Sequence, residues 1–469
     1  MIKFQGVFRE FSVISGAAIL GQIVSLLISF FIAKQLGAGK FGEYSYIIAL
    51  TSLGPILYGL GIPNAIYRFY NTAVFNEYKI KVVSSGLFVV LISSLILSIT
   101  LFFVISNIHF KEFIGYELRI VSLTFLLSLN NLLNVILRAS RDYKVTSLLS
   151  ISQPFIKAVL ISGLFFSNSL KISSLLLILI VIEFFSLTII IFFIRDKIST
   201  KFICLRTVRE MFRYGYSFIP HKLLAKGQDP LIKNIVLNLF GTEALGVYAL
   251  GQKLALPFGF LIDKFQFIWG PLKFNIKNKS KDSYEIFKNI SNSYISVINL
   301  LSSAYALFLV GVIQLGLIQE YRGIETIALL FVTMAALRGN YYMYGTGAEF
   351  GKTMIILPFI SGGYILILLL FKFFGPTEGI ELNYIFLPLM LAELYSIITI
   401  RYYSKSIFFF PIKHLTIIST MTLVLTGLLY THFNNWFIFV FSGLFYAAFI
   451  LKQKQSLRNT FQILNDHSI

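Results

Sequence analysis

The sequence contains little of what soluble enzymes use for chemistry. It has one cysteine, Cys204, and five histidines in 469 residues, so it forms no intramolecular disulfide and we expect no cysteine-rich metal site. The full phosphate-binding pattern G-x-x-x-x-G-K-[ST], HExxH zinc motifs and G-x-S-x-G nucleophile motifs are absent. Because paired carboxylates in a sizeable loop are missing as well, we expect no enzyme activity, no metal and no cofactor.

Acidic residues are also scarce. There are 21 Asp and Glu against 40 Lys and Arg, which gives a net charge of +19. Nucleic-acid binding is not predicted, because the basic residues are dispersed among apolar segments instead of being gathered on one soluble face. A lipid bilayer with anionic headgroups, or an anionic lipid-linked substrate, fits this distribution better.

Long apolar segments dominate the sequence. The hydrophobic fraction is 57% and the mean hydropathy is +0.79, which indicates an all-α polytopic membrane protein. A barrel would instead show alternating segments of about ten residues. A spanning helix needs about 20 apolar residues, and about fourteen such segments can be placed. They lie near residues 13–33, 44–62, 84–106, 118–137, 147–167, 173–194, 216–240, 244–268, 290–316, 324–346, 353–374, 382–402, 413–432 and 435–451.

The basic residues predict the orientation of these segments. Most of the 40 Lys and Arg lie in connections that share one side of the membrane. Since positive connections stay in the cytoplasm, both termini are predicted to be cytoplasmic. The connections on the other side are short, so we expect no extracytoplasmic domain.

An internal repeat predicts two related lobes. Shifting the sequence by about 204 residues matches residues 36–50 to residues 240–254, with Gly, Gly, Tyr and Leu in common. Since six segments separate the two copies, the repeat is parallel, and one lobe can rock against the other. The predicted domains are an N-terminal six-helix lobe (1–194), a basic cytoplasmic linker (195–213), a C-terminal six-helix lobe (214–402) and two extra spans with a cytoplasmic tail (403–469).

The segment 216–240 carries four charges within a spanning length, Lys222, Lys226, Asp229 and Lys233. At about 100° per residue they share one stripe of a helix, and each would cost about 3 kcal/mol if it faced lipid. Asp229 could pair with a neighbouring lysine, and Lys222 could reach the inner surface. Because one carboxylate cannot neutralise three ammonium groups, we favour a track of cations for phosphate groups.

Other intramembrane charges extend this hypothesis. Lys157, Lys253 and Arg338 lie in other predicted spans and could converge with the lysines of 216–240 on a positive lumen. Arg138 and Arg141 share a face with two asparagines. They fit the cytoplasmic entrance for a substrate and simple anchoring of the span about equally well.

Acidic residues in predicted spans have two interpretations. Glu183 and Glu393 could pair with intramembrane lysines or bind a coupling proton or sodium ion. Asp229 and Asp263 are further candidates for ion coupling. The sequence leaves these alternatives open.

The segment LGAGKFGEYSY (36–46), followed by GLGIPNAIYR with Arg68, resembles the polysaccharide exporters of the MOP (multidrug/oligosaccharidyl-lipid/polysaccharide) superfamily. More narrowly, the chain resembles Wzx-type O-antigen flippases. The resemblance implies a V-shaped, MATE-like fold of two lobes. It also implies translocation of an undecaprenyl-pyrophosphate-linked glycan across the bacterial inner membrane during lipopolysaccharide biosynthesis, with Arg68 at the cytoplasmic entrance. A polysaccharide polymerase and a chain-length regulator are implied partners.

Three other functions compete with this hypothesis. A cation-coupled drug exporter of the same superfamily should carry acids in its cavity, so three lysines in segment 216–240 argue against it. A membrane glycosyltransferase would need a sizeable loop, which the chain lacks. A scaffold for a biosynthetic complex is compatible with the sequence.

Overall fold

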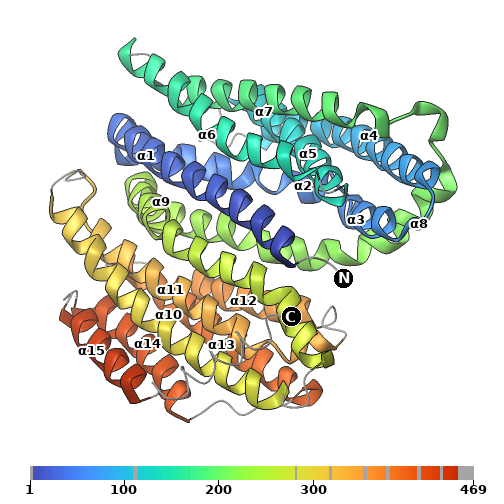
Figure 1. Ribbon diagram of the computed structural model, residues 1–469. Helices are drawn as coiled ribbons and strands as arrows, with labels where there is room; N and C mark the ends of the chain where they lie inside the picture. The colour runs from blue at the N-terminus through green and yellow to red at the C-terminus, as the bar shows by residue number, and fades with distance from the viewer. Residues whose placement is uncertain are drawn as a thin grey trace. The chain divides into compact units, whose positions relative to one another are not determined.

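The computed structural model describes residues 4–108, 115–140, 142–167, 170–279, 283–315, 320–351, 356–375, 381–408, 414–433 and 437–452. Over these ranges the chain is helical, with no strand (Figure 1). It divides into two compact units, residues 1–234 and 235–469. The predicted all-α fold class is therefore confirmed.

Unit 1 contains α1 to α8 and the beginning of α9. Its elements are α1 (Phe4–Thr51), α2 (Gly54–Leu57), α3 (Ile62–Thr72), α4 (Asn76–Ile108), α5 (Glu117–Ala139), α6 (Tyr143–Phe166), α7 (Ile172–Ile194), η2 (Arg195–Lys197), η3 (Thr200–Phe202), α8 (Leu205–Gly215), η4 (Tyr216–Phe218) and the first part of α9 (Ile219–Lys279).

Unit 2 contains the rest of α9 and the elements that follow it. These are α10 (Ser283–Gln314), α11 (Ile324–Tyr344), η5 (Ala348–Phe350), α12 (Ile356–Phe374), η7 (Leu382–Ile385), α13 (Phe386–Ile407), α14 (His414–Phe433) and α15 (Phe437–Lys452).

Two glycines show the internal repeat in the backbone. Gly37 interrupts α1 with φ 71° and ψ 169°, and Gly241 interrupts α9 with φ 83° and ψ −178°. Glycine tolerates positive φ because it has no Cβ. The two residues are the pair that the repeat superposes, so α1 and α9 each consist of two helices joined at equivalent positions.

The number of membrane spans agrees only in part with the sequence prediction. Nine helical segments of the described residues are long and apolar enough to cross a membrane. Two of them, Leu20–Leu57 and Leu205–Gln266, run through the glycine interruptions, and Thr416–Tyr430 and Phe437–Ala448 are shorter apolar helices. The chain is therefore a multi-pass membrane protein, while the count of fourteen stays a prediction.

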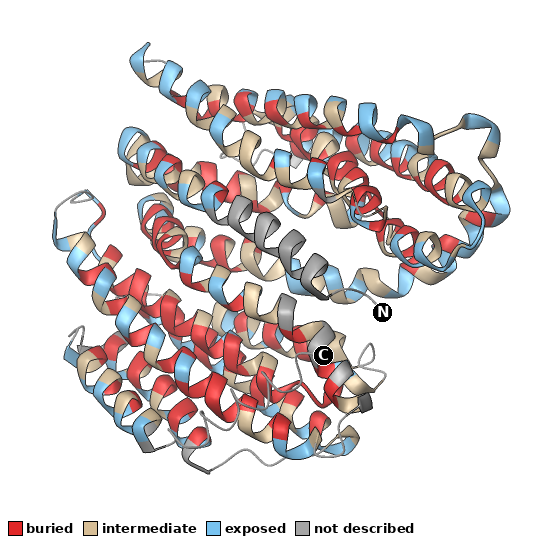
Figure 2. Cartoon of the chain, viewed as in Figure 1, coloured by how far each residue is buried: buried red, intermediate tan, exposed pale blue. Residues whose placement is uncertain are grey.

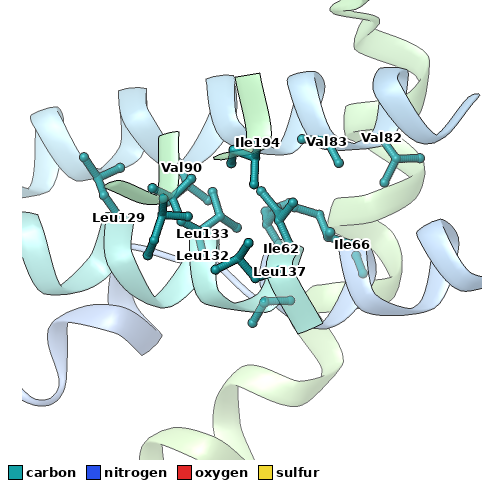
Figure 3. Close-up of a cluster of buried hydrophobic side chains, with 14 of the residues drawn as sticks. Ile62, Ile66, Val82, Val83, Val90, Leu129, Leu132, Leu133, Leu137 and Ile194 are labelled. Carbon is teal, nitrogen blue, oxygen red and sulfur yellow. The ribbon is translucent and has the colours of Figure 1, made fainter. Parts of the chain in front are cut away.

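The core of unit 1 is an apolar cluster between α3, α4, α5, α6, α7 and α8. Figure 3 shows ten of its residues, labelled, from α3, α4, α5 and α7, and all cluster members are buried. Figure 2 shows buried residues along one side of many helices and exposed residues along the other. On α7 the exposed side carries large apolar residues, including Phe184 and Phe192, which suits contact with lipid.

The basic linker is attached to unit 1. The Ser199 amide donates to Ser84 Oγ at 2.9 Å, and the Cys204 amide donates to Ser85 Oγ at 3.0 Å. Lys197 forms an ion pair with Asp142. The division between the units falls after Asn234, within α9, so the lobe boundaries expected from the sequence stay predictions.

Asp142 is the acid that holds this linker. Burial raises the pKa of its carboxyl, but hydrogen bonds from Lys197 and Ser140 and the charge of Lys197 outweigh burial and leave the pKa below its ordinary value. The carboxylate is therefore ionised at neutral pH.

A buried polar seam joins α14 to α10, and α10 to α11, within unit 2. Thr416 Oγ1 donates to Asn292 Oδ1 at 2.6 Å, and Asn299 Nδ2 donates to Ser419 Oγ at 2.9 Å. Asn340 Nδ2 donates to Asn299 Oδ1 at 3.1 Å. Because such bonds between helices hold membrane bundles together, α14 is an integral part of unit 2.

Candidate functional site

Four exposed cations lie on α3, α5 and α9 of unit 1, and we call Arg68, Arg138, Lys222 and Lys226 the cation cluster. All four residues are exposed, and none forms an ion pair with an acid of the described residues. The cluster combines residues expected in the lumen with residues expected at the cytoplasmic entrance.

Lys222 and Asn64 connect α9 to α3. Lys222 Nζ donates to Asn64 Oδ1 at 2.7 Å. The positive charge of Arg138, at the end of α5, acts on Lys222, so a second positive charge lies near the lysine that contacts Asn64. Asn64 Nδ2 is buried and has no hydrogen-bond partner within the described part of the chain. An unmet donor beside two cations is suited to an anionic oxygen.

The backbone explains why α3 presents this face. Gly61 precedes α3 with φ 73°, and a Cβ on Gly61 would lie 2.1 Å from the carbonyl oxygen of Gly215. Only glycine allows the backbones at the start of α3 and the end of α8 to come so close. Asn64 and Arg68 then lie one helical turn apart on α3.

Arg68 is held by aromatic contact. Its Cζ lies 4.5 Å from the centroid of the Tyr214 ring, and the centroids of the Phe69 and Tyr214 rings are 5.9 Å apart. A cation over an aromatic face is stabilised without a counter-charge. The guanidinium therefore keeps its full charge for another ligand.

The charges predicted in the segment 216–240 divide into two groups. Lys233 Nζ lies 3.0 Å from Asp229 Oδ2, and the Lys233 side chain is 7% exposed. Lys222 and Lys226 are exposed and remain outside this pair. Asp229 therefore pairs with the buried lysine, and the two lysines nearer the start of α9 have no acidic partner among the described residues.

Lys157 lies beside an acid instead of joining the cation cluster. Glu183 Oε2 and the Glu183 carbonyl each accept a hydrogen bond of 2.7 Å from Asn130 Nδ2, and the charges of Lys157 and Glu183 interact. These residues connect α5, α6 and α7. Because the Glu183 side chain accepts from Asn130 and no ion pair with Lys157 is found among the described residues, both interpretations of Glu183 stay predictions.

Unit 2 holds the remaining candidates separately. Arg338 lies 3.3 Å from Glu393, whose side chain is 6% exposed, whereas that of Arg338 is 56% exposed. Lys253 is half-buried on α9 and Asp263 is exposed on the same helix. Arg141 lies outside the described residues. No group of three or more potential metal ligands occurs in the part of the chain that the structure describes.

One buried ion pair was not anticipated from the sequence. Lys273, whose side chain is 3% exposed, pairs with Glu349, and Trp269 Nε1 donates to Thr346 Oγ1 at 3.2 Å close by. Lys273 follows a predicted span, where a cytoplasmic surface position is the ordinary expectation. No local signal links it to a partner 76 residues away.

A family model and several solved structures match the chain. A family model described as a polysaccharide biosynthesis protein matches residues 7–260, and no curated protein matches the chain significantly. The MATE multidrug transporter DinF-BH in complex with R6G is similar, with TM-score 0.59 and 15% identity over 86% of this chain and 97% of that chain.

Two further solved structures share this fold. A mutant of the Vibrio cholerae MATE transporter VcmN has TM-score 0.57 and 12% identity over 86% of this chain and 97% of that chain. A MOP superfamily transporter from Pyrococcus furiosus has TM-score 0.51 and 14% identity over 85% and 95%. For the latter protein, the reversed polarity of its binding pocket is said to suggest a different function. At these identities the likeness shows the fold alone.

Proposed function

Because the chain belongs to the polysaccharide biosynthesis protein family of the MOP superfamily, we propose that it is a flippase for a lipid-linked oligosaccharide. Its family and its structural neighbours are exporters or transporters. The proposed substrate is an undecaprenyl-pyrophosphate-linked repeat unit of O-antigen or a related surface polysaccharide. It would move from the cytoplasmic to the outer leaflet of the bacterial inner membrane, with both termini of the protein in the cytoplasm.

The observation that carries this proposal is the cation cluster together with Asn64. Transfer of a pyrophosphate into hydrocarbon is prohibitive unless protein groups replace its hydration. Lys222 and Arg138 supply positive charge, and Asn64 Nδ2 supplies a hydrogen-bond donor that has no other partner among the described residues. The polyprenyl chain needs no such site, because it can stay in lipid.

The dispersed arrangement of the cations suits transport. Lys222 and Lys226 lie one turn apart on α9, and Arg68 lies on α3. Several moderate contacts allow the head group to be released, whereas one bidentate clamp would retain it. Rocking of the two lobes would then expose the substrate to the opposite leaflet.

The acids of the spans fit a supporting role. Asp229 and Glu393 each form an ion pair with a cation, and Glu183 accepts a hydrogen bond from Asn130. Proton or sodium coupling, in which Asp263 is a further candidate, would require an ion to compete with these partners. If the transporter is coupled to protons or sodium ions, binding of the ion to one of these acids should break the contact between that acid and its neighbouring side chain.

The experiment uses the purified full chain in liposomes that contain a fluorescent undecaprenyl-pyrophosphate-linked oligosaccharide. A membrane-impermeant reductant destroys the fluorophore in the outer leaflet, so the slow phase of signal loss reports translocation. We expect the translocation rate of the Lys222→Gln/Arg138→Gln double variant to fall by at least about tenfold for each substituted residue. A charge-assisted hydrogen bond contributes about 1.5–3 kcal/mol, which corresponds to such a factor in rate.

The matched control is Lys40→Gln, which removes an exposed lysine that pairs with Glu43 at 2.9 Å. It should flip the lipid like the unmodified chain. Translocation no faster than in protein-free liposomes would refute the proposal, as would an unchanged rate in the double variant. Faster movement of an organic cation than of the oligosaccharide lipid would favour the drug exporter.

A further inference from the structure

The short helix α8 has one face that is built into unit 1. Thr207, Met211 and Gly215 recur at one-turn intervals and are buried, and α8 packs against α3 and α4. Met211 belongs to the apolar core cluster. In Figure 1 the helix lies beside α3 at one end of unit 1. Its orientation is therefore fixed by packing.

The exposed face of α8 is apolar along one strip. The exposed fractions are 78% for Leu205, 45% for Phe212 and, just after the helix, 54% for Tyr216. The Phe212 and Tyr216 rings are stacked, with centroids 6.3 Å apart. These three residues lie within about 40° of one another around the helix axis. They form a continuous apolar strip that unit 1 does not cover.

Arginines border this strip on one side. Arg209 and Arg213 are exposed, and neither forms an ion pair with an acid in the described ranges. Arg206 is different, because it lies 3.3 Å from Glu210, which is the one acid of the helix. The side of α8 next to the apolar strip therefore carries two uncompensated positive charges.

The length of α8 limits what the strip can contact. Its 11 residues extend about 16 Å, roughly half the thickness of the hydrocarbon core, so α8 cannot span the bilayer. It leads through η4 directly into α9, and the candidate spanning segment Leu205–Gln266 begins with α8 and runs on through α9. An apolar strip with adjoining arginines at the end of a span is typical of a helix that lies in the membrane interface.

We propose that the exposed face of α8 is a binding surface for anionic phospholipid, with headgroup phosphates at Arg209 and Arg213 and acyl chains against Leu205, Phe212 and Tyr216. Charge complementarity selects anionic over zwitterionic headgroups. Lipid bound to this surface would influence the position of Arg68 in the cation cluster, because the ring centroid of Tyr214, on the same helix, lies 4.5 Å from Arg68 Cζ. It does not rest on the identity of the transported molecule.

The test uses the natural reporter Cys204, which is the sole cysteine of the chain and precedes α8. The full chain, labelled at this thiol with a fluorophore, is placed in nanodiscs of phosphatidylcholine. Nitroxide-labelled phosphatidylglycerol or nitroxide-labelled phosphatidylcholine is then added in equal amounts. We expect phosphatidylglycerol to quench more strongly, and its preference to fall as salt is raised from 0.05 to 0.5 M, values chosen to span the screening range.

The variant that tests the arginines is Arg209→Gln/Arg213→Gln. Its preference for phosphatidylglycerol should fall by roughly 30-fold at most, which corresponds to about 1 kcal/mol per arginine near an anionic surface. The control Lys40→Gln/Arg119→Gln removes the same charge outside α8 and should retain the preference. Equal quenching of the unmodified chain by both lipids would overturn the proposal, as would absence of quenching by either, which would indicate a protein partner instead.

Discussion

The ion pair between Arg338 and Glu393 gives the sharpest test of how unit 2 tolerates charge. Glu393 is nearly inaccessible, with 6% of its side chain exposed, whereas the Arg338 side chain is 56% exposed. Removing the arginine therefore leaves a carboxylate without water or a counter-charge. Removing the carboxylate leaves a guanidinium whose side chain is more than half exposed. We predict that the two substitutions differ strongly in cost.

The magnitudes follow from this asymmetry. Breaking a fully buried pair costs about 3–5 kcal/mol, and the partial exposure of Arg338 reduces this to about 2–3 kcal/mol for Arg338→Gln. This cost has an upper limit, because Glu393 can bind a proton once it has lost its partner. Protonating a glutamate costs about 4 kcal/mol at pH 7 and about 1 kcal/mol at pH 5. Glu393→Gln should cost about 1 kcal/mol or less. The double variant should cost less than Arg338→Gln alone.

The assay is a double-mutant cycle on the free energy of unfolding, measured by denaturant titration in mixed micelles at pH 7 and pH 5. We expect a coupling energy of about 2 kcal/mol at pH 7, and a smaller penalty for Arg338→Gln at pH 5. Arg338→Lys is the matched control, because it keeps the charge and should retain most of the stability. An equal or larger loss in Glu393→Gln than in Arg338→Gln would refute the reasoning.

Three further predictions concern stability. Gly61→Ala should destabilise the protein by about 3 kcal/mol or more, because the added Cβ clashes with the Gly215 backbone and alanine is strained at positive φ. The control is Gly163→Ala, whose added Cβ would have no atom within 4 Å and which should not lower the melting temperature. Asn299→Leu should cost about 1–2 kcal/mol through loss of two buried hydrogen bonds, and an unchanged denaturation midpoint would contradict this. Because Asp142 has a lowered pKa, its contribution, about 1 kcal/mol or less, is present above about pH 4 and disappears as the pH falls further. Lowering the pH should then speed hydrogen exchange of the Ser199 amide in the unmodified chain, after correction for the intrinsic exchange rate. The Asp142→Asn variant should show no such change, because it already lacks the ion pair at pH 6.

Local sequence patterns predicted the parts of the fold that depend on neighbouring residues. Apolar length predicted the helices, and the repeat predicted that Gly37 and Gly241 play equivalent roles, which their backbone angles confirm. The spacing of Asp229 and Lys233 allowed their ion pair. Each of these signals lies within one helix, or depends on a direct comparison of two segments.

Partners on different helices could not be predicted from the sequence. Arg338 and Glu393 are 55 residues apart, and Asn130 and Glu183 are 53 apart, so only the packing of helices shows that they meet. The seam of unit 2 left a partial signal, because Asn292 and Asn299 recur at helical spacing within α10. That pattern could have indicated a polar contact with another helix, although not with α14.

The buried charges follow a common physical rule. A buried ion is stable only when a counter-charge or hydrogen bonds replace its hydration, and Lys233, Lys273 and Glu393 each have such a partner. Charges without an acidic partner must therefore remain accessible to water or to a mobile anion. Lys222 and Lys226 meet this condition at the start of α9. The spanning segment with the most charge thus separates a structural ion pair, Lys233 with Asp229, from two exposed lysines that have no acidic partner among the described residues.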